Sequence, residues 1–185
     1  MKYPITKTSV VCTILSLGIM LSACKKPNKV VQSNVPLNIP AISFVIPFGQ
    51  TSNDTTITIY YNVDSVIRAA NPSFNSSNIK SVVAASVTLS SSNADNLDNF
   101  GNFSSFYIQM ISGENPTPVT FAQVTDNPSA YALSLDVPTN DSLQLKNYFY
   151  TNSFTFTIRD TVSFPTFIDL NTTATIKFFA VAGPN

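Results

Sequence analysis

Hydrophobic and polar residues alternate along most of this 185-residue chain. Phe154, Phe156 and Ile158, for example, alternate with two threonines and an arginine. The same period-two pattern recurs in residues 37–46, 56–61, 80–90, 106–111, 119–124, 131–137 and 176–181. Such alternation gives a β-strand one hydrophobic face. We therefore predict about eight strands, of which the first contains Pro40, a residue that favours an edge strand or a bulge.

The segments between these strands are rich in turn-forming residues, as in 112–116 and 125–128. Short strands with one apolar face, separated by such turns, are typical of two antiparallel sheets packed face to face. All 14 phenylalanines follow residue 24 and can fill a core that contains no tryptophan. The pattern predicts an all-β fold, an antiparallel two-sheet β-sandwich.

Two short stretches have the i, i+3, i+4 spacing of an amphipathic helix instead. They consist of Val63, Val66, Ile67 and Ala70, and of Leu145, Tyr148 and Phe149. Asn62 or Asp64 can cap the first stretch, and Pro72 limits its end. Asn140 or Asp141 can cap the second. We expect one or two short helices that cross an open end of the sandwich.

The N-terminal segment has the layout of an export signal. Two lysines in the first seven residues precede an apolar stretch at 10–21, which is too short for a spanning helix but suits a signal peptide. It ends in Leu21, Ser22, Ala23 and Cys24. This ending resembles the lipobox of bacterial lipoproteins, which implies cleavage before Cys24 and acylation of its thiol and new amine. The alternative is an ordinary secretory signal with a cysteine there by chance.

The resemblance divides the chain into a signal peptide (1–23), a lipidated Cys24 with its tether (24–36) and a β-sandwich domain (37–185). Cys12 leaves with the signal, so the domain has no thiol and no disulfide. Lys25, Lys26 and Lys29 follow the lipid, where they either meet anionic headgroups or form a solvated linker.

Composition adds a second, broader resemblance. Ser, Thr and Asn make up about a third of the chain. Together with the lipobox and the sandwich without disulfides, this is similar to small envelope lipoproteins of Bacteroidota type. The resemblance implies a protein of the bacterial cell envelope, lipid-anchored in the outer membrane at its periplasmic or its surface face.

Several chemistries are disfavoured by composition. The chain has no histidine, one glutamate and only five glycines, so it lacks a His general base, a Ser-His-Asp triad and a Gly-rich phosphate loop. After processing, eight basic and ten acidic residues remain, which is unsuited to nucleic acid. We expect no enzyme activity, no cofactor and no nucleic-acid partner. A glycoside hydrolase would need two converging carboxylates; the acids of the second half are Asp136, Asp141, Asp160 and Asp169.

Two groups of residues are candidates for binding. Asn93, Asp95 and Asp98 concentrate oxygen atoms in one loop and could hold a ligand or Ca²⁺, although the loop lacks the EF-hand pattern. The alternative is a turn-rich loop held by its own Asx side chains. The second group, Tyr60, Tyr107, Tyr148 and Tyr150, could stack on sugars or a partner protein, but packing within the fold is favoured.

The function indicated is that of a membrane-anchored, non-catalytic binding or scaffolding domain, with an envelope protein or a glycan as partner. A glycan-binding protein would need exposed aromatic residues on one sheet face or loop end. A hydrolase, the least favoured alternative, would need converging carboxylates. The longest polar connections, 93–102 and 112–118, are where we expect a partner surface, since loops carry function more often than strands.

The anchor can be tested directly. Cys24→Ala should move the protein from the membrane fraction to the soluble fraction, because two or more acyl chains are what hold it stably. The measurement is immunoblotting of fractionated cells, with Cys12→Ala as the matched control that stays in the membrane. Equal membrane association of Cys24→Ala and the unaltered protein would contradict the anchor.

Overall fold

A computed structural model of the chain describes residues 32–185, so the signal peptide, Cys24 and most of the tether lie outside the described residues. Within this range the chain forms nine strands, one α-helix and three short 3₁₀ turns. The strands are β1 (Ser33–Asn38), β2 (Ile42–Ile46), β3 (Ser52–Tyr60), β4 (Ile79–Ser91), β5 (Phe103–Ser112), β6 (Val119–Val124), β7 (Ser134–Asp136), β8 (Ser153–Val162) and β9 (Leu170–Ala182). The helix is α2 (Val63–Ala70), and the 3₁₀ turns are η1 (Ser76–Asn78), η2 (Phe100–Asn102) and η3 (Lys146–Tyr148).

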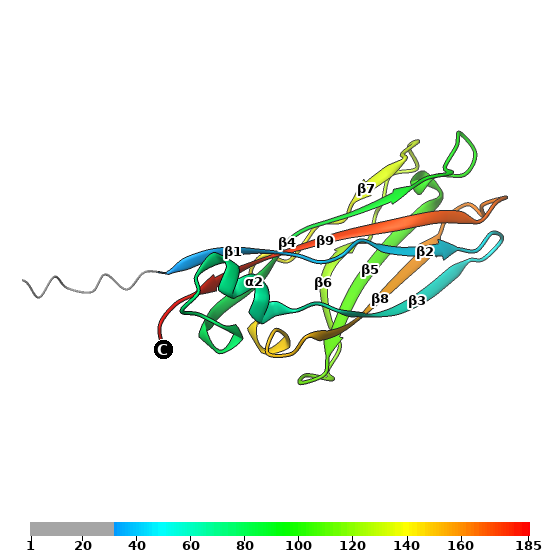
Figure 1. The fold of residues 1–185 in the computed structure, drawn as a ribbon. Coiled ribbons are helices and arrows are strands. Elements are labelled where there is room, and N and C mark those ends of the chain that lie inside the picture. Colours follow the sequence, from blue (N-terminus) through cyan, green and yellow to red (C-terminus); the bar gives the residue numbers. More distant parts are fainter. Residues whose placement is uncertain (1–31) are drawn as a thin grey trace, which may run out of the picture. The chain divides into compact units, whose positions relative to one another are not determined.

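The strands form two antiparallel sheets packed as a sandwich (Figure 1). One sheet has the order β1-β9-β4-β7, with β2 also paired to β9, and the other has the order β3-β8-β5-β6. Early strands thus pair with late ones: β1 and β2 with β9, β3 with β8, β4 with β7, and β5 with β6. This nested pairing is the jelly-roll form of the β-sandwich. The expected all-β, two-sheet fold is confirmed.

The first predicted strand is divided in two around Pro40. Both halves pair with β9, in registers that join Asn38 to Lys177 and Ile42 to Ala174. Proline has no N–H to donate to a ladder, which explains the break. β1 begins at Ser33, so four residues that the sequence assigned to the tether belong to the sheet.

The core follows the alternation along the strands. Ten of the 14 phenylalanines are buried. Phe178 of β9 contacts Phe121 of β6 and Phe149 beside η3, with ring centroids 5.2 and 5.0 Å apart. These contacts join the two sheets, because β9 and β6 belong to different sheets. Aromatic packing therefore links the two sheets of a domain that has no disulfide.

One strand departs from simple alternation. Regular alternation through residues 80–90 places Val83 and Ala85 on the same face as the buried Val87 and Leu89, but the structure buries Val82 and Ala84 instead. The register of β4 against β9 shifts between Ala84 and Ser86. A bulge inserts one residue and so exchanges the faces of the strand on either side of it. The prediction for Val83 and Ala85 is wrong for this reason.

The helical predictions are confirmed for α2 and only in part for η3. The Asn62 side chain caps α2 by accepting the N–H of Ser65 at 2.9 Å. Asp64 instead accepts the N–H of Ser76 at 2.6 Å. The second stretch forms a single 3₁₀ turn that starts after Leu145, without a side-chain cap.

The connections between strands gather at two opposite ends. Residues 47–51, 92–102, 125–133 and 163–169 lie at one end, which we call the tip. The connections 61–78, 113–118 and 137–152 lie at the other end (Figure 1). Ser33 pairs with Ala182 at that second end, so the described chain starts and finishes there. The two loops expected to form a partner surface therefore lie at opposite ends.

The aromatic link between the sheets can be tested by two neighbouring substitutions in β9. Phe178→Ala should lower the free energy of unfolding by about 3–5 kcal/mol, the usual cost of deleting a buried Phe. Phe179→Ala should lower it by less than about 1 kcal/mol, because that ring is 39% exposed. Denaturant unfolding measures both, and equal losses would contradict the proposed importance of the Phe178 contacts.

Candidate binding site at the tip

Exposed hydrophobic side chains concentrate at the tip. Among the described residues, seven of the eleven large hydrophobic side chains that are exposed belong to it. They are Phe48, Leu97, Tyr131, Leu133, Phe164, Phe167 and Ile168. Three of the four phenylalanines left outside the core are in this set. Clustered exposed apolar residues are characteristic of interaction sites, since isolated ones are common but groups are not.

The connection between β8 and β9 contributes three of these residues, more than any other loop of the tip. Phe167 is 76% exposed and Phe164 is 59% exposed. Sequence reasoning missed this group because it assigned all the phenylalanines to the core. A signal was present: Phe164, Phe167 and Ile168 lie close together outside any alternating stretch, around Pro165.

Hydrogen bonds from backbone N–H groups to carboxylates and a carbonyl connect three of the tip loops. The Asp98 carboxylate accepts the N–H of Phe167 at 2.6 Å, and Asp169 accepts the N–H of Phe48 at 2.9 Å. Gly49 has a positive φ of 69°, which glycine tolerates well, and its N–H donates to the Thr166 carbonyl at 3.1 Å. The exposed phenylalanines therefore project from backbone that is fixed by neighbouring loops.

The fourth loop is held just as closely. The Asn127 side-chain amide donates to the carbonyls of Phe100 and Phe103 at 2.7 and 2.9 Å. Gly101 lies so near the Ala130 carbonyl that an added Cβ would come within 2.3 Å of its oxygen. Only glycine fits this contact, so residues 92–102 and 125–133 pack directly against each other.

The residues expected to bind a ligand or calcium use their oxygen atoms to shape the tip. Asn93 donates to the Asp169 carbonyl at 2.7 Å and accepts the N–H of Asn171 at 2.8 Å. Asp95 accepts the backbone N–H groups two and three residues ahead at 2.8 and 2.9 Å, and these bonds lower its pKa. Asp98 is engaged with the neighbouring loop. Among residues 32–185, no three acidic or cysteine side chains are grouped to hold a metal ion.

A hollow of about 260 Å³ lies between the tip loops. Leu97, Tyr131 and Phe164 line it, next to Asn96 and Ser129. Its aromatic and polar lining could accept a small apolar group or a sugar ring.

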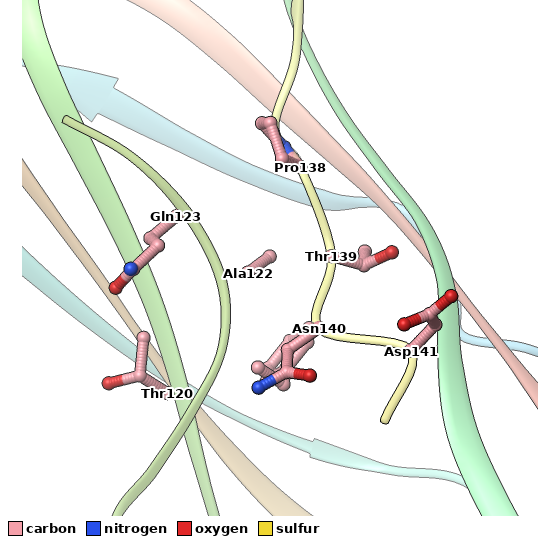
Figure 2. A pocket seen from close by; sticks show the side chains of 8 residues that line it. Thr120, Ala122, Gln123, Pro138, Thr139, Asn140 and Asp141 are labelled. Atoms are coloured by element: carbon pink, nitrogen blue, oxygen red, sulfur yellow. The ribbon is translucent and has the colours of Figure 1, made fainter. Parts of the chain in front are cut away.

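A larger hollow of about 430 Å³ lies away from the tip, beside β6 (Figure 2). Thr120 and Gln123 lie on one side of it, and Asn140 and Asp141 on the other. Its walls are held by backbone bonds such as Gln123 N–H to the Pro138 carbonyl at 2.9 Å. The hollow is polar, and the only aromatic residue in its lining, Phe121, is buried in the core. It offers no exposed aromatic anchor, and we favour the tip.

The four candidate tyrosines do not form a site together. Tyr148 is buried and donates its hydroxyl to the Thr117 carbonyl at 2.8 Å, as packing predicts. Tyr107 is half-buried on β5. Tyr60 and Tyr150 are exposed, but they belong to the end opposite the tip.

The carboxylates considered for hydrolysis are dispersed. Asp136 belongs to β7 and accepts the Thr88 hydroxyl at 2.7 Å. Asp141 lies in the next connection, where the Ser142 hydroxyl is 3.4 Å away. Asp160 lies near the end of β8, and Asp169 is the last residue of the connection from β8 to β9.

Asp160 is the unusual acid of the described chain. It is fully buried near the end of β8, and neither carboxylate oxygen has a hydrogen-bond partner in the structure. Its cross-strand neighbour Asn53 donates its amide to Thr55 instead. Burial raises the pKa of Asp160 to about 7; the nearby Asn53 opposes this shift, and the negative charge of Asp54 adds to it. The site therefore favours the neutral acid over the anion.

No family model and no curated protein matches this chain. Solved structures that resemble it are viral capsids. The empty head of turnip yellow mosaic virus is 12% identical, with 84% of this chain and 83% of that chain covered and a TM-score of 0.30. The BFDV capsid protein is 12% identical, with 82% and 99% covered and a TM-score of 0.29. Cocksfoot mottle virus is 8% identical, with 100% and 98% covered and a TM-score of 0.29. TM-scores this low carry no argument, and the description of the fold depends on the strand order alone.

The buried acid predicts a pH dependence of stability. The unfolded chain releases this proton near pH 3.9, about the model-peptide value, whereas the folded chain keeps it until about pH 7. The folded state therefore binds more protons between these pH values, and the free energy of unfolding falls as pH rises through the window. Asp160→Asn should remove this fall and stabilise the protein above pH 7 by an amount on the order of a few kcal/mol.

Denaturant unfolding at about pH 5 and about pH 8 checks this prediction, since these values lie inside and above the titration window. Asp126→Asn, a change at an exposed tip position, is the matched control and should leave the pH profile unchanged. Asp160→Asn and the unaltered protein should differ in free energy of unfolding more at about pH 8 than at about pH 5. If the difference is the same at both pH values, Asp160 does not titrate in this range.

Proposed function

We propose that this chain is a lipid-anchored envelope protein whose β-sandwich binds or scaffolds another envelope component through the tip, without catalysis. The observation that carries the proposal is the concentration of exposed hydrophobic side chains on the four tip loops. Aromatic anchors on fixed backbone lose little conformational entropy when they are buried by a partner. The tip has both properties.

The position of the tip suits an anchored protein. The described chain enters the sandwich at Ser33, at the end opposite the tip. A lipid on Cys24 would hold the sandwich by that end and leave the tip for a partner. Among residues 32–185 we find no helix that is long and apolar enough to cross a membrane. We propose attachment to the outer membrane through the lipid on Cys24.

A non-catalytic role is supported by the chemistry of the tip. Its aspartates Asp95, Asp98 and Asp169 accept backbone N–H groups, as a structural role requires. The chain has no histidine to act as a general base. The tip contains many apolar anchors and no cluster of free acid and base groups.

A glycan is the second candidate partner, on one specific observation. Tyr131 and Phe164 line the tip hollow beside Asn96 and Ser129. Aromatic faces can pack against a sugar ring, while amides and hydroxyls bond its hydroxyl groups.

Tyr131→Ala should then abolish binding on an array of neutral oligosaccharides, whereas Tyr60→Ala at the opposite end should leave it unchanged.

The proposed site can be tested in the native envelope. A photo-crosslinking residue placed at Gln50 of the full anchored chain should trap a partner. Phe48→Ala with Phe167→Ala should reduce the trapped product at least about tenfold, because loss of a single hot-spot anchor, about 2 kcal/mol or more, already weakens binding by more than tenfold. Tyr60→Ala with Phe179→Ala removes the same kind of exposed ring elsewhere and should trap as much as the unaltered protein. Equal trapping by both pairs would place the site outside the tip.

A further inference from the structure

The tip differs from the rest of the molecule in charge as well as in hydrophobicity. Its four connections contain four acids and no lysine or arginine. The acids are Asp95, Asp98, Asp126 and Asp169. The three connections at the opposite end contain three acids and two basic residues. The formal charge is therefore −4 at the tip and −1 at the other end.

This negative charge is not neutralised from within. The basic residue nearest the tip in sequence is Arg159 of β8, and its guanidinium already makes two hydrogen bonds of 2.7 Å with Asp54. Backbone hydrogen bonds lower the pKa of Asp95 and keep that carboxylate ionised at neutral pH. Asp98 is buried, so the tip presents its phenylalanines among three exposed carboxylates, those of Asp95, Asp126 and Asp169, without counter-ions of its own.

We propose that the tip docks a cationic segment of a partner protein, in which lysine or arginine residues stand next to large apolar ones. The inference rests on the proposed function and names the chemistry of its partner. The rings of Phe48, Phe164 and Phe167 would cover the partner's apolar side chains. The surrounding carboxylates would pair with its basic groups and steer its approach.

The same charges argue against other occupants. A second copy of the tip would bring four more aspartates to the interface, and like charges brought together cost several kcal/mol. Anionic lipid headgroups and nucleic-acid phosphates would be repelled in the same way. A neutral glycan could donate hydroxyl hydrogen bonds to the aspartates but would have no net-charge attraction to them, so its binding would depend little on salt.

The test uses the full, lipidated chain in neutral phosphatidylcholine nanodiscs and three fluorescent peptides of equal length. One alternates Lys with Phe, one alternates Glu with Phe, and one alternates Lys with Ser. Fluorescence anisotropy should show the Lys/Phe peptide binding at least about tenfold more tightly than either of the others, since it alone satisfies both features of the tip. Raising the salt from about 0.05 to about 0.5 M should weaken it several-fold.

Paired variants assign the effect to the tip. Asp95→Asn with Asp126→Asn removes two charges but retains an acceptor oxygen on each side chain, and should weaken the Lys/Phe peptide about fivefold or more. Glu114→Gln with Asp141→Asn removes the same charge at the opposite end and should change nothing. Circular dichroism of each variant confirms that the sheet content is retained.

The outcomes separate this inference from the proposed function. If Phe48→Ala with Phe167→Ala abolishes trapping in the envelope while all three peptides bind equally, the tip is a binding site and its proposed preference for cations is overturned. If a neutral oligosaccharide displaces the Lys/Phe peptide and its own binding is insensitive to salt, the partner is a glycan and the inference also fails. If trapping and peptide binding are both unaffected by the tip variants, both proposals fail.

Discussion

Pairing with β9 is the interaction on which the rest of the structure depends. This strand of 13 residues pairs with β1, β2 and β4, and therefore joins both ends of the described chain in one sheet. Its inward side chains include Phe178, which contacts Phe121 and Phe149 across the core. With no disulfide available to the domain, this ladder and these rings hold the sandwich closed. The early strands therefore need the last strand of the chain to complete their sheet.

The same pairing explains why the tip exists. Because early strands pair with late ones, four connections far apart in sequence meet at one end, and the termini of the described chain meet at the other. The connections at the tip are fixed by short side chains bound to backbone, as in the bonds from Asp98 to Phe167 and from Asp169 to Phe48. Since these hydrogen bonds position the loops, several exposed rings can share one surface without packing into the core.

Hydrophobicity and charge have complementary roles at this surface. Exposed rings favour association of any kind, including self-association. Four aspartates beside them disfavour contact between two tips and with anionic surfaces. The tip would select its partner both by repelling anionic surfaces and by attracting a cationic segment. Asp160, buried without a hydrogen-bond partner near this end, adds a cost in stability that grows as the pH rises.

The sequence by itself determined the fold class, the helix at Val63–Ala70 and the main buried face of β8, because alternation and capping are local properties of the chain. It also predicted that the domain has no disulfide. It could not predict the bulge near Ala84 or the short length of β7, which depend on the pairing of β4 with β9 and with β7. Pro40 signalled an irregularity in the first strand, but not that both halves would pair with β9. The tip illustrates the same limit: Phe164 and Phe167 lie outside the alternating stretches, but the sequence does not show which other loops lie beside them. Only the nested strand order, which gathers four distant loops at one end, decided that they face solvent together.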